Sequence, residues 1–251
     1  MRTFWTLWKR EISTYFRTSL AVTLFVFVLV LTGFNFYSSV SFLNHGPTQM
    51  SIVEAFFSNS FFWVTLLALP PLLTMRLYAE EYRSGTIETL LTAPVRDSQV
   101  LLAKFFGAFI FFLLLWIPSL LYFVLFWPSA HQVAAAGYGA YCGAYGMLLL
   151  QGALYISIGC MASSLTSHQL ISGIITFCVI TLFFFAGILL PSSSFSTILL
   201  RQFSGFFFPM ETMKSFSHGL VDTRSIVFFA SFILFFLFMT FHIVQSRKWR
   251  R

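Results

Sequence analysis

The chain has 251 residues, of which 58% are hydrophobic and only 9% charged, whereas soluble domains carry about 25% charged residues. So few polar side chains could not cover a soluble fold, and the composition predicts a membrane protein. The formal charge of +7 does not indicate a nucleic-acid partner, because the basic residues fall in short segments between apolar runs. The cysteines lie in apolar runs without metal-ligand spacing and are interpreted as apolar fillers: Cys142, Cys160 and Cys178.

Residues 1–17 predict an amphipathic helix in the cytoplasmic interface of the bilayer. One face is marked by residues at helical spacing: Phe4, Trp8, Glu11, Ile12 and Tyr15. Basic side chains fall largely on the other side of this helix. The alternative is a simple basic flank that orients insertion of the first span.

Six apolar stretches are long enough to cross a hydrocarbon core, which takes about 20 residues of helix. They are Leu20 to Val40, Phe57 to Met75, Phe105 to Trp127, Gly139 to Ala162, Leu170 to Leu190 and Ile226 to Val244. The fourth is rich in glycine, and its Gly139-x-x-x-Gly143 pair could let another helix approach closely. The predicted fold is an all-α integral membrane bundle of six helices in one domain.

The basic residues predict the orientation of the bundle. With the N-terminus in the cytoplasm, twelve basic residues lie inside and three outside, which together account for all 15 Lys and Arg. The three outer ones are Arg201, Lys214 and Arg224. This bias follows the positive-inside rule and places both termini in the cytoplasm.

The long outer segment, residues 191–224, contains six phenylalanines, more than a solvated loop usually carries. Two short amphipathic pieces that dip back into the outer leaflet would explain them. A loop packed over the helix ends would explain them equally well.

The cytoplasmic segment between the second and third spans predicts a short helix over residues 84–92. It has candidate helix-start residues and a stop: Ser84, Gly85, Thr86 and Pro94. Ile87, Leu90 and Leu91 form an apolar stripe at i, i+3 and i+4. Such a stripe either contacts a partner protein or rests on the membrane or on the base of the bundle.

Residues 79–95, AEEYRSGTIETLLTAPV, with KFFGA at 104–108, resemble the signature of type-2 ABC export permeases. The closest resemblance is to the gliding-motility and nitrous-oxide-reductase-maturation branch. Weaker matching stretches follow in order along the chain: Arg10-Glu11-Ile12 with Tyr15-Phe16, Ser164-Leu165-Thr166 with Gln169, and Gly219 to Arg224.

The resemblance implies that the helix from Gly85 to Leu91 is a coupling helix seated in a groove of a cytosolic ATPase. It also implies that two permease copies, or one copy and a homologous permease, pair around a pathway lined by the first, second and fifth spans. The residues implied for the ATPase-coupling interface are Glu80, Glu81, Arg83, Ser84, Gly85, Thr86, Ile87, Glu88, Leu90, Leu91 and Pro94.

No phosphate-binding G-x-x-x-x-G-K-[ST] loop occurs in the sequence, so the chain is not expected to hydrolyse nucleotide by itself. The resemblance implies that a partner ABC ATPase dimer binds ATP and Mg and carries out the hydrolysis. The leading hypothesis is export of a substrate across the inner membrane of a bacterium, with a periplasmic auxiliary protein as a further candidate partner. The alternative is a membrane scaffold that transmits force in an envelope or motility machine. A membrane enzyme is disfavoured, because the spans offer no convergent catalytic side chains.

Overall fold

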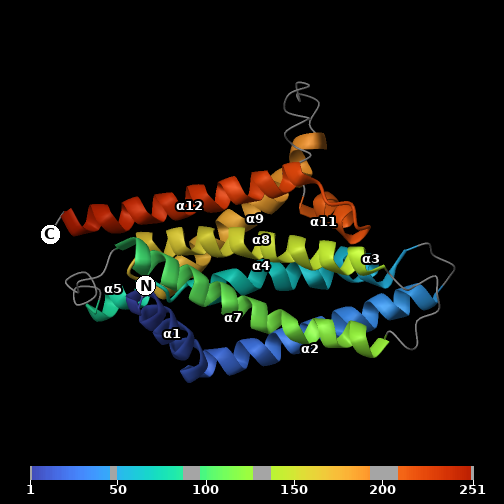
Figure 1. The fold of residues 1–251 in the computed structure, drawn as a ribbon, viewed down its shortest axis with the longest axis horizontal. Helices are drawn as coiled ribbons and strands as arrows, with labels where there is room; N and C mark the ends of the chain where they lie inside the picture. The colour runs from blue at the N-terminus through green and yellow to red at the C-terminus, as the bar shows by residue number, and fades with distance from the viewer. Residues whose placement is uncertain (1, 46–49, 87–96, 127–136, 193–208, 250–251) are drawn as a thin grey trace.

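The computed structural model describes residues 2–45, 50–86, 97–126, 137–192 and 209–249 (Figure 1). This part of the chain is helical and contains no strand. The long helices are α2 (Ser19–Asn44), α4 (Ser60–Thr74), α7 (Asp97–Phe126), α8 (Tyr138–Leu165), α9 (Gln169–Ser192) and α12 (Thr223–Trp249). The short helices are α1 (Arg2–Arg17), α3 (Ile52–Ser58), α5 (Ala79–Ser84) and α11 (Pro209–Ser217).

Six segments of the described chain are long and apolar enough to cross a membrane, and they match the six predicted spans. The second of these, 60–84, combines α4 with α5. The prediction of an all-α integral membrane bundle is therefore confirmed.

Two helices begin at other residues than the predicted spans. The second span was expected to begin at Phe57, but that residue belongs to α3, and α4 begins only at Ser60. Asn59 is extended (φ −71°, ψ 142°), and its side chain accepts a hydrogen bond from the Phe61 amide, so it caps a new helix. The third span was expected from Phe105, but α7 already begins at Asp97, whose carboxylate suits the positive end of the helix dipole.

Helix α8 lies at the centre of the bundle and contacts α4, α7, α9, α11 and α12. In its most apolar stretch 78% of the residues are buried, against 11% for α12. Its small residues allow this central position. A Cβ at Gly152 would overlap the Phe112 ring, and one at Gly159 would overlap the Thr74 side chain. Glycine at these positions lets α7 and α4 approach α8 closely.

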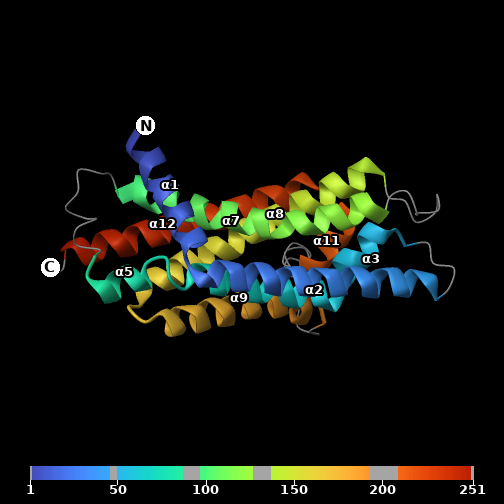
Figure 2. The same ribbon diagram turned by 90° about the horizontal axis from the view of Figure 1, so that it is seen from below.

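The two ends of the bundle differ. Both chain termini and α5 lie at one end, while α3 and α11 lie toward the other (Figures 1 and 2). We call the end that carries α1 and α5 the base. At the far end α11 packs against α3 and α8, and a Cβ at Gly143 would overlap the backbone of Phe216. The close approach predicted at Gly143 is thus made to α11 rather than to another span.

Residues 209–217 of the long outer segment therefore form a helix held against the bundle. Glu54 of α3 has a carboxylate that is only 4% exposed. Its Oε1 lies 3.6 Å from Nζ of Lys214 in this helix and 3.3 Å from Nε2 of His218, which directly follows the helix. The amide Nε2 of Gln151 in α8 donates a hydrogen bond to the Pro209 carbonyl (3.2 Å). The rest of the segment, residues 193–208, lies outside the described part.

Candidate functional site

A buried lysine organises the base of the bundle. Leu101, Lys104 and Ala108 share one face of α7, and this face is turned into the bundle, so the Lys104 side chain is only 2% exposed. A buried ammonium group is costly unless it is paired and hydrogen-bonded. Lys104 is therefore expected to have partners of opposite charge.

Two helices supply carboxylate partners, and the turn before α5 adds a carbonyl. The Nζ of Lys104 donates to Oε1 of Glu81 in α5 (2.8 Å), to Oε1 of Glu11 in α1 (3.3 Å) and to the Leu77 carbonyl (2.8 Å). It also lies 5.3 Å from the centroid of the Tyr78 ring, within range of a cation–π interaction. We call Lys104, Glu11 and Glu81 the base cluster. It joins α1, α5 and α7 through one cation.

Aromatic and hydrogen-bonding contacts also hold α1 against the bundle. The Tyr15 ring stacks on Phe111 of α7 with centroids 5.0 Å apart, and its hydroxyl donates to the Leu73 carbonyl (3.0 Å). Burial raises the pKa of Tyr15 well above its usual value, so the hydroxyl keeps its proton for this bond. Because Gly107 has no side chain, α1 can pass close to α7: a Cβ there would lie 3.0 Å from that of Glu11.

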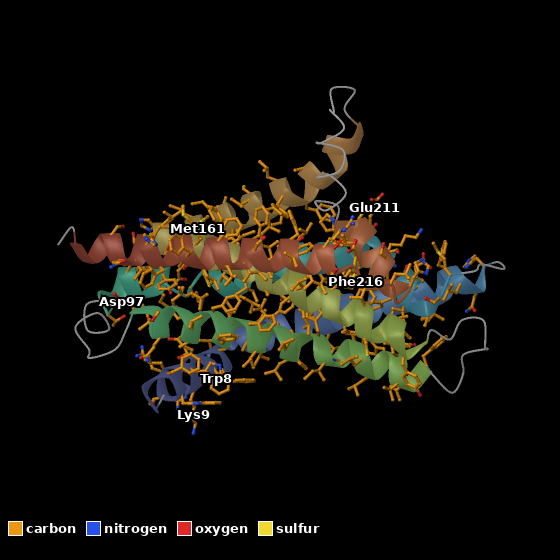
Figure 3. The ribbon with its side chains drawn as sticks, turned by 45° about the horizontal axis from the view of Figure 1, so that its top comes forward. Trp8, Lys9, Asp97, Met161, Glu211 and Phe216 are labelled. Atoms are coloured by element: carbon orange, nitrogen blue, oxygen red, sulfur yellow. The ribbon has the colours of Figure 1, made fainter. Side chains whose placement is uncertain are left out.

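The predicted face of α1 is thus half-buried against the rest of the chain. Phe4, Trp8, Glu11, Ile12 and Tyr15 are all partly covered, whereas Trp5 and Phe16 are 60% and 58% exposed. Figure 3 shows Lys9 pointing away from the bundle. Aromatic side chains therefore remain on α1 for contact with lipid, beside the face that packs on α7.

Helix α5 is fixed to the centre of the bundle at its first residues. The amides of Tyr78 and Ala79 both donate to the Ser163 hydroxyl of α8, at 3.0 and 3.2 Å. The helix ends at Ser84, whose hydroxyl donates to the Glu80 carbonyl (2.8 Å). Gly85 follows with φ +72°, a left-handed conformation that favours glycine and closes the helix.

The structure separates the residues of the predicted coupling interface. Glu81 lies in the base cluster, while Glu80, Arg83, Ser84, Gly85 and Thr86 are exposed. Ser84 is the last residue of α5, and the chain turns at Gly85. The remaining residues lie outside the described part: Ile87, Glu88, Leu90, Leu91 and Pro94.

Lys104 was not among the predicted site residues. It counted toward the positive-inside bias and toward the family resemblance through KFFGA at 104–108, but no ion pair was predicted for it, because its partners lie 93 and 23 residues away along the chain. The signal that could have revealed it is its position: it lies at helical spacing from Leu101 and Ala108, on the apolar face of the span.

The fold and the site together show which class of protein this chain represents. A bundle with six helices able to cross a membrane, with an ionic cluster linking short helices at one end, is a multi-pass membrane protein. The family model described as ABC-2 family transporter protein matches residues 8–186, from α1 into α9. The chain therefore belongs to the ABC-2 transporter family and is a permease component, with ATP hydrolysed on a separate subunit. No curated protein sequence matches the chain.

Proposed function

We propose that this permease exports its substrate across the cytoplasmic membrane of a bacterium, with both termini in the cytoplasm. Twelve of its 15 basic residues fall in the segments assigned to that side. The placement of both termini and α5 at one end of the bundle supports this orientation (Figure 2). The motif at residues 79–95 supports membership of the gliding-motility and nitrous-oxide-reductase-maturation branch.

The base cluster is the observation that carries the proposal. A helical bundle in lipid responds to a cytosolic ATPase only through a rigid contact between the two. The segment that follows α5 bears an apolar stripe of Ile87, Leu90 and Leu91. Glu81 joins α5 through Lys104 to α7 and α1. A force applied to the segment after α5 would therefore reach α1, α4 and α7 together.

The functional unit in this proposal has several chains. Residues 85–91 form the coupling helix, which is seated in a groove of a dimeric cytosolic ABC ATPase. Two permeases, identical or homologous, pair around a pathway lined by the first, second and fifth spans (α2, α4 and α9). A periplasmic protein is a further candidate partner at the end that carries α3 and α11.

The test is the double variant Leu90→Asp/Leu91→Asp, studied with the partner ATPase. Burying an unpaired carboxylate in the interface costs several kcal/mol, so the ATPase should no longer co-purify, or should hydrolyse ATP without transport. Glu88→Arg should have the same effect more weakly, as expected for a charge at the rim of an interface. ATPase pull-down, substrate-stimulated hydrolysis and membrane yield are measured together.

The matched control is Leu220→Asp/Val221→Asp. These two residues follow α11 at the opposite end of the bundle, and their exposed fractions are 70% and 56%. They undergo the same substitution of an apolar side chain by aspartate. The control should bind and couple as the wild type does. Normal ATPase binding and normal coupling in the Leu90/Leu91 variant would show that this stripe rests on lipid or on the bundle, and would overturn the proposal.

A further inference from the structure

A cavity of about 160 Å³ lies beside the base cluster, between α1, the end of α4, α5 and the start of α7. Its polar lining carries charges of both signs: Arg10, Glu11, Arg76, Glu80, Glu81 and Lys104. Its apolar lining comes from leucines, among them Leu72 and Leu73 at the end of α4. The cavity is therefore lined by positive, negative and hydrocarbon groups together.

Two polar atoms in this lining are buried without a hydrogen-bond partner among the residues that the structure describes. They are Nε of Arg76 and Oε2 of Glu81. The other oxygen of Glu81 already accepts from Lys104, and Arg10 Nη2 lies 4.0 Å from it. An unpaired buried polar group costs about 1–3 kcal/mol, more when charged. Two residues of the cavity lining, Arg76 and Glu81, thus carry one cationic donor and one anionic acceptor whose partners are missing.

The position of the cavity indicates that such a ligand comes from the lipid bilayer. Thr18 lies on the cavity wall between α1 and α2, where the first apolar span begins, and Leu72 and Leu73 lie where the second ends. The cavity wall therefore contains both the ends of apolar spans and the charged residues next to them. In a membrane protein this boundary lies at the depth of the lipid headgroups. Trp5 and Phe16, exposed on α1, are the side chains expected at that depth.

We propose that this cavity binds the headgroup of a phospholipid carrying a primary ammonium, that is, a phosphoethanolamine headgroup. The phosphodiester oxygens accept from the Arg76 guanidinium, and the ammonium donates to Oε2 of Glu81. Cavities of about 150 Å³ hold a benzene ring, and a phosphoethanolamine group is only slightly larger. The acyl chains then extend along the leucines toward the bilayer core. This inference requires no coupling to an ATPase and stands apart from the proposed function.

The two unpaired atoms make the proposed site selective. A phosphocholine headgroup has the same charges, but its quaternary ammonium has no N–H to give Glu81. A phosphoglycerol headgroup has no cation. Loss of one charge-assisted hydrogen bond corresponds to about tenfold or more in affinity. The wild-type permease should therefore bind phosphatidylethanolamine about tenfold more tightly than its fully N-methylated analogue. The monomethyl and dimethyl lipids keep an N–H for Glu81, so the loss should fall mainly at the third methyl group.

The measurement is native mass spectrometry of the purified full-length chain in detergent, titrated with each of these lipids at matched acyl chains. Equal retention of the ethanolamine and choline lipids would overturn the proposal. Soluble glycerophosphoethanolamine and inorganic phosphate serve as competitors, which distinguish a site for lipid from a site for a soluble ligand. Displacement of the lipid by glycerophosphoethanolamine at equal concentration would identify a soluble zwitterion as the ligand. Displacement by phosphate would show that the cavity is a general anion site. Either result would overturn the lipid assignment.

Variants locate the site. Arg76→Gln removes the phosphate partner and should weaken binding of the ethanolamine and choline lipids alike, whereas Arg76→Lys should keep part of the affinity. Thr14→Phe should lower binding by filling the cavity without a change of charge. The control Arg17→Gln removes the same charge from an exposed residue of α1 that does not line the cavity, and should bind as the wild type does. Unchanged affinity for the ethanolamine lipid in Arg76→Gln, or equal loss in Arg17→Gln, would overturn the proposal.

Discussion

A single ammonium group at Lys104 pairs with two carboxylates that approach from different helices. All three side chains are largely withdrawn from water, at 2%, 15% and 14% exposure for Lys104, Glu11 and Glu81. Removing one partner of a buried ion pair costs about 3–5 kcal/mol, because the charge that remains is uncompensated. The cluster is therefore a point at which a single substitution should affect several helices.

We expect Lys104→Met to destabilise the permease by about 3–5 kcal/mol, since two carboxylates would then face each other without a cation. Thermal unfolding of the purified protein in detergent measures this loss. The triple variant Lys104→Met/Glu11→Gln/Glu81→Gln removes all three charges and should recover most of the stability. A single variant as stable as the wild type would show that the cluster contributes little to the fold.

The same triple variant separates stability from coupling. If the base cluster transmits motion between α5, α7 and α1, the variant should fold and bind its ATPase but transport poorly. Restored stability together with full transport would assign the cluster a structural role alone.

At the scale of elements, the packing of α8 against α4 depends on one missing side chain. Thr74 lies against Gly159, and its hydroxyl is held by a hydrogen bond to the Pro70 carbonyl (2.8 Å). A β-branched side chain in a helix has little rotamer freedom with which to move aside. An added methyl group at position 159 must therefore separate the two helices or break this bond.

Gly159→Ala should accordingly destabilise the bundle by about 1–3 kcal/mol. Gly146→Ala is the matched control, since a Cβ at Gly146 meets nothing within 4 Å and alanine favours the helix. Unfolding temperatures in detergent compare the two variants. Equal effects of the two substitutions would mean that α4 and α8 are not in close contact at Gly159.

The number and type of the main elements could be predicted because a span is a local signal, visible in about 20 consecutive residues. The residues of the predicted interfacial helix likewise form α1. The break at Asn59 was missed because the apolar run continues on both sides of it and only a side-chain cap marks the new helix. The partners of Lys104 were missed because no local pattern predicts a contact between residues 93 positions apart.

The proposed orientation concerns the whole molecule and can be tested with single cysteines. The chain has three free cysteines, so the background must first be made cysteine-free. A cysteine at Ser215 in α11 should react with impermeant thiol reagents applied to intact cells. Cysteines at Ser84 and Ser246 should react only after permeabilisation. All three serines are exposed, so accessibility reports the side of the membrane. The reverse pattern would overturn the orientation and the coupling assignment together.

The central place of α8 has a consequence for how the protein is made. Of the described spans, residues 60–84 and α8 are the least apolar and also the most buried, so α8 is poorly suited to enter lipid alone. Its buried Gln151 bonds the carbonyl of Pro209, which is synthesised only after α9 is complete. During synthesis α8 therefore leaves the ribosome with this amide unpaired, and it depends on α4 and α7, the earlier spans that it contacts, already being in place. Membrane insertion of this permease is then a cooperative event, completed only when the segment that contains α11 arrives.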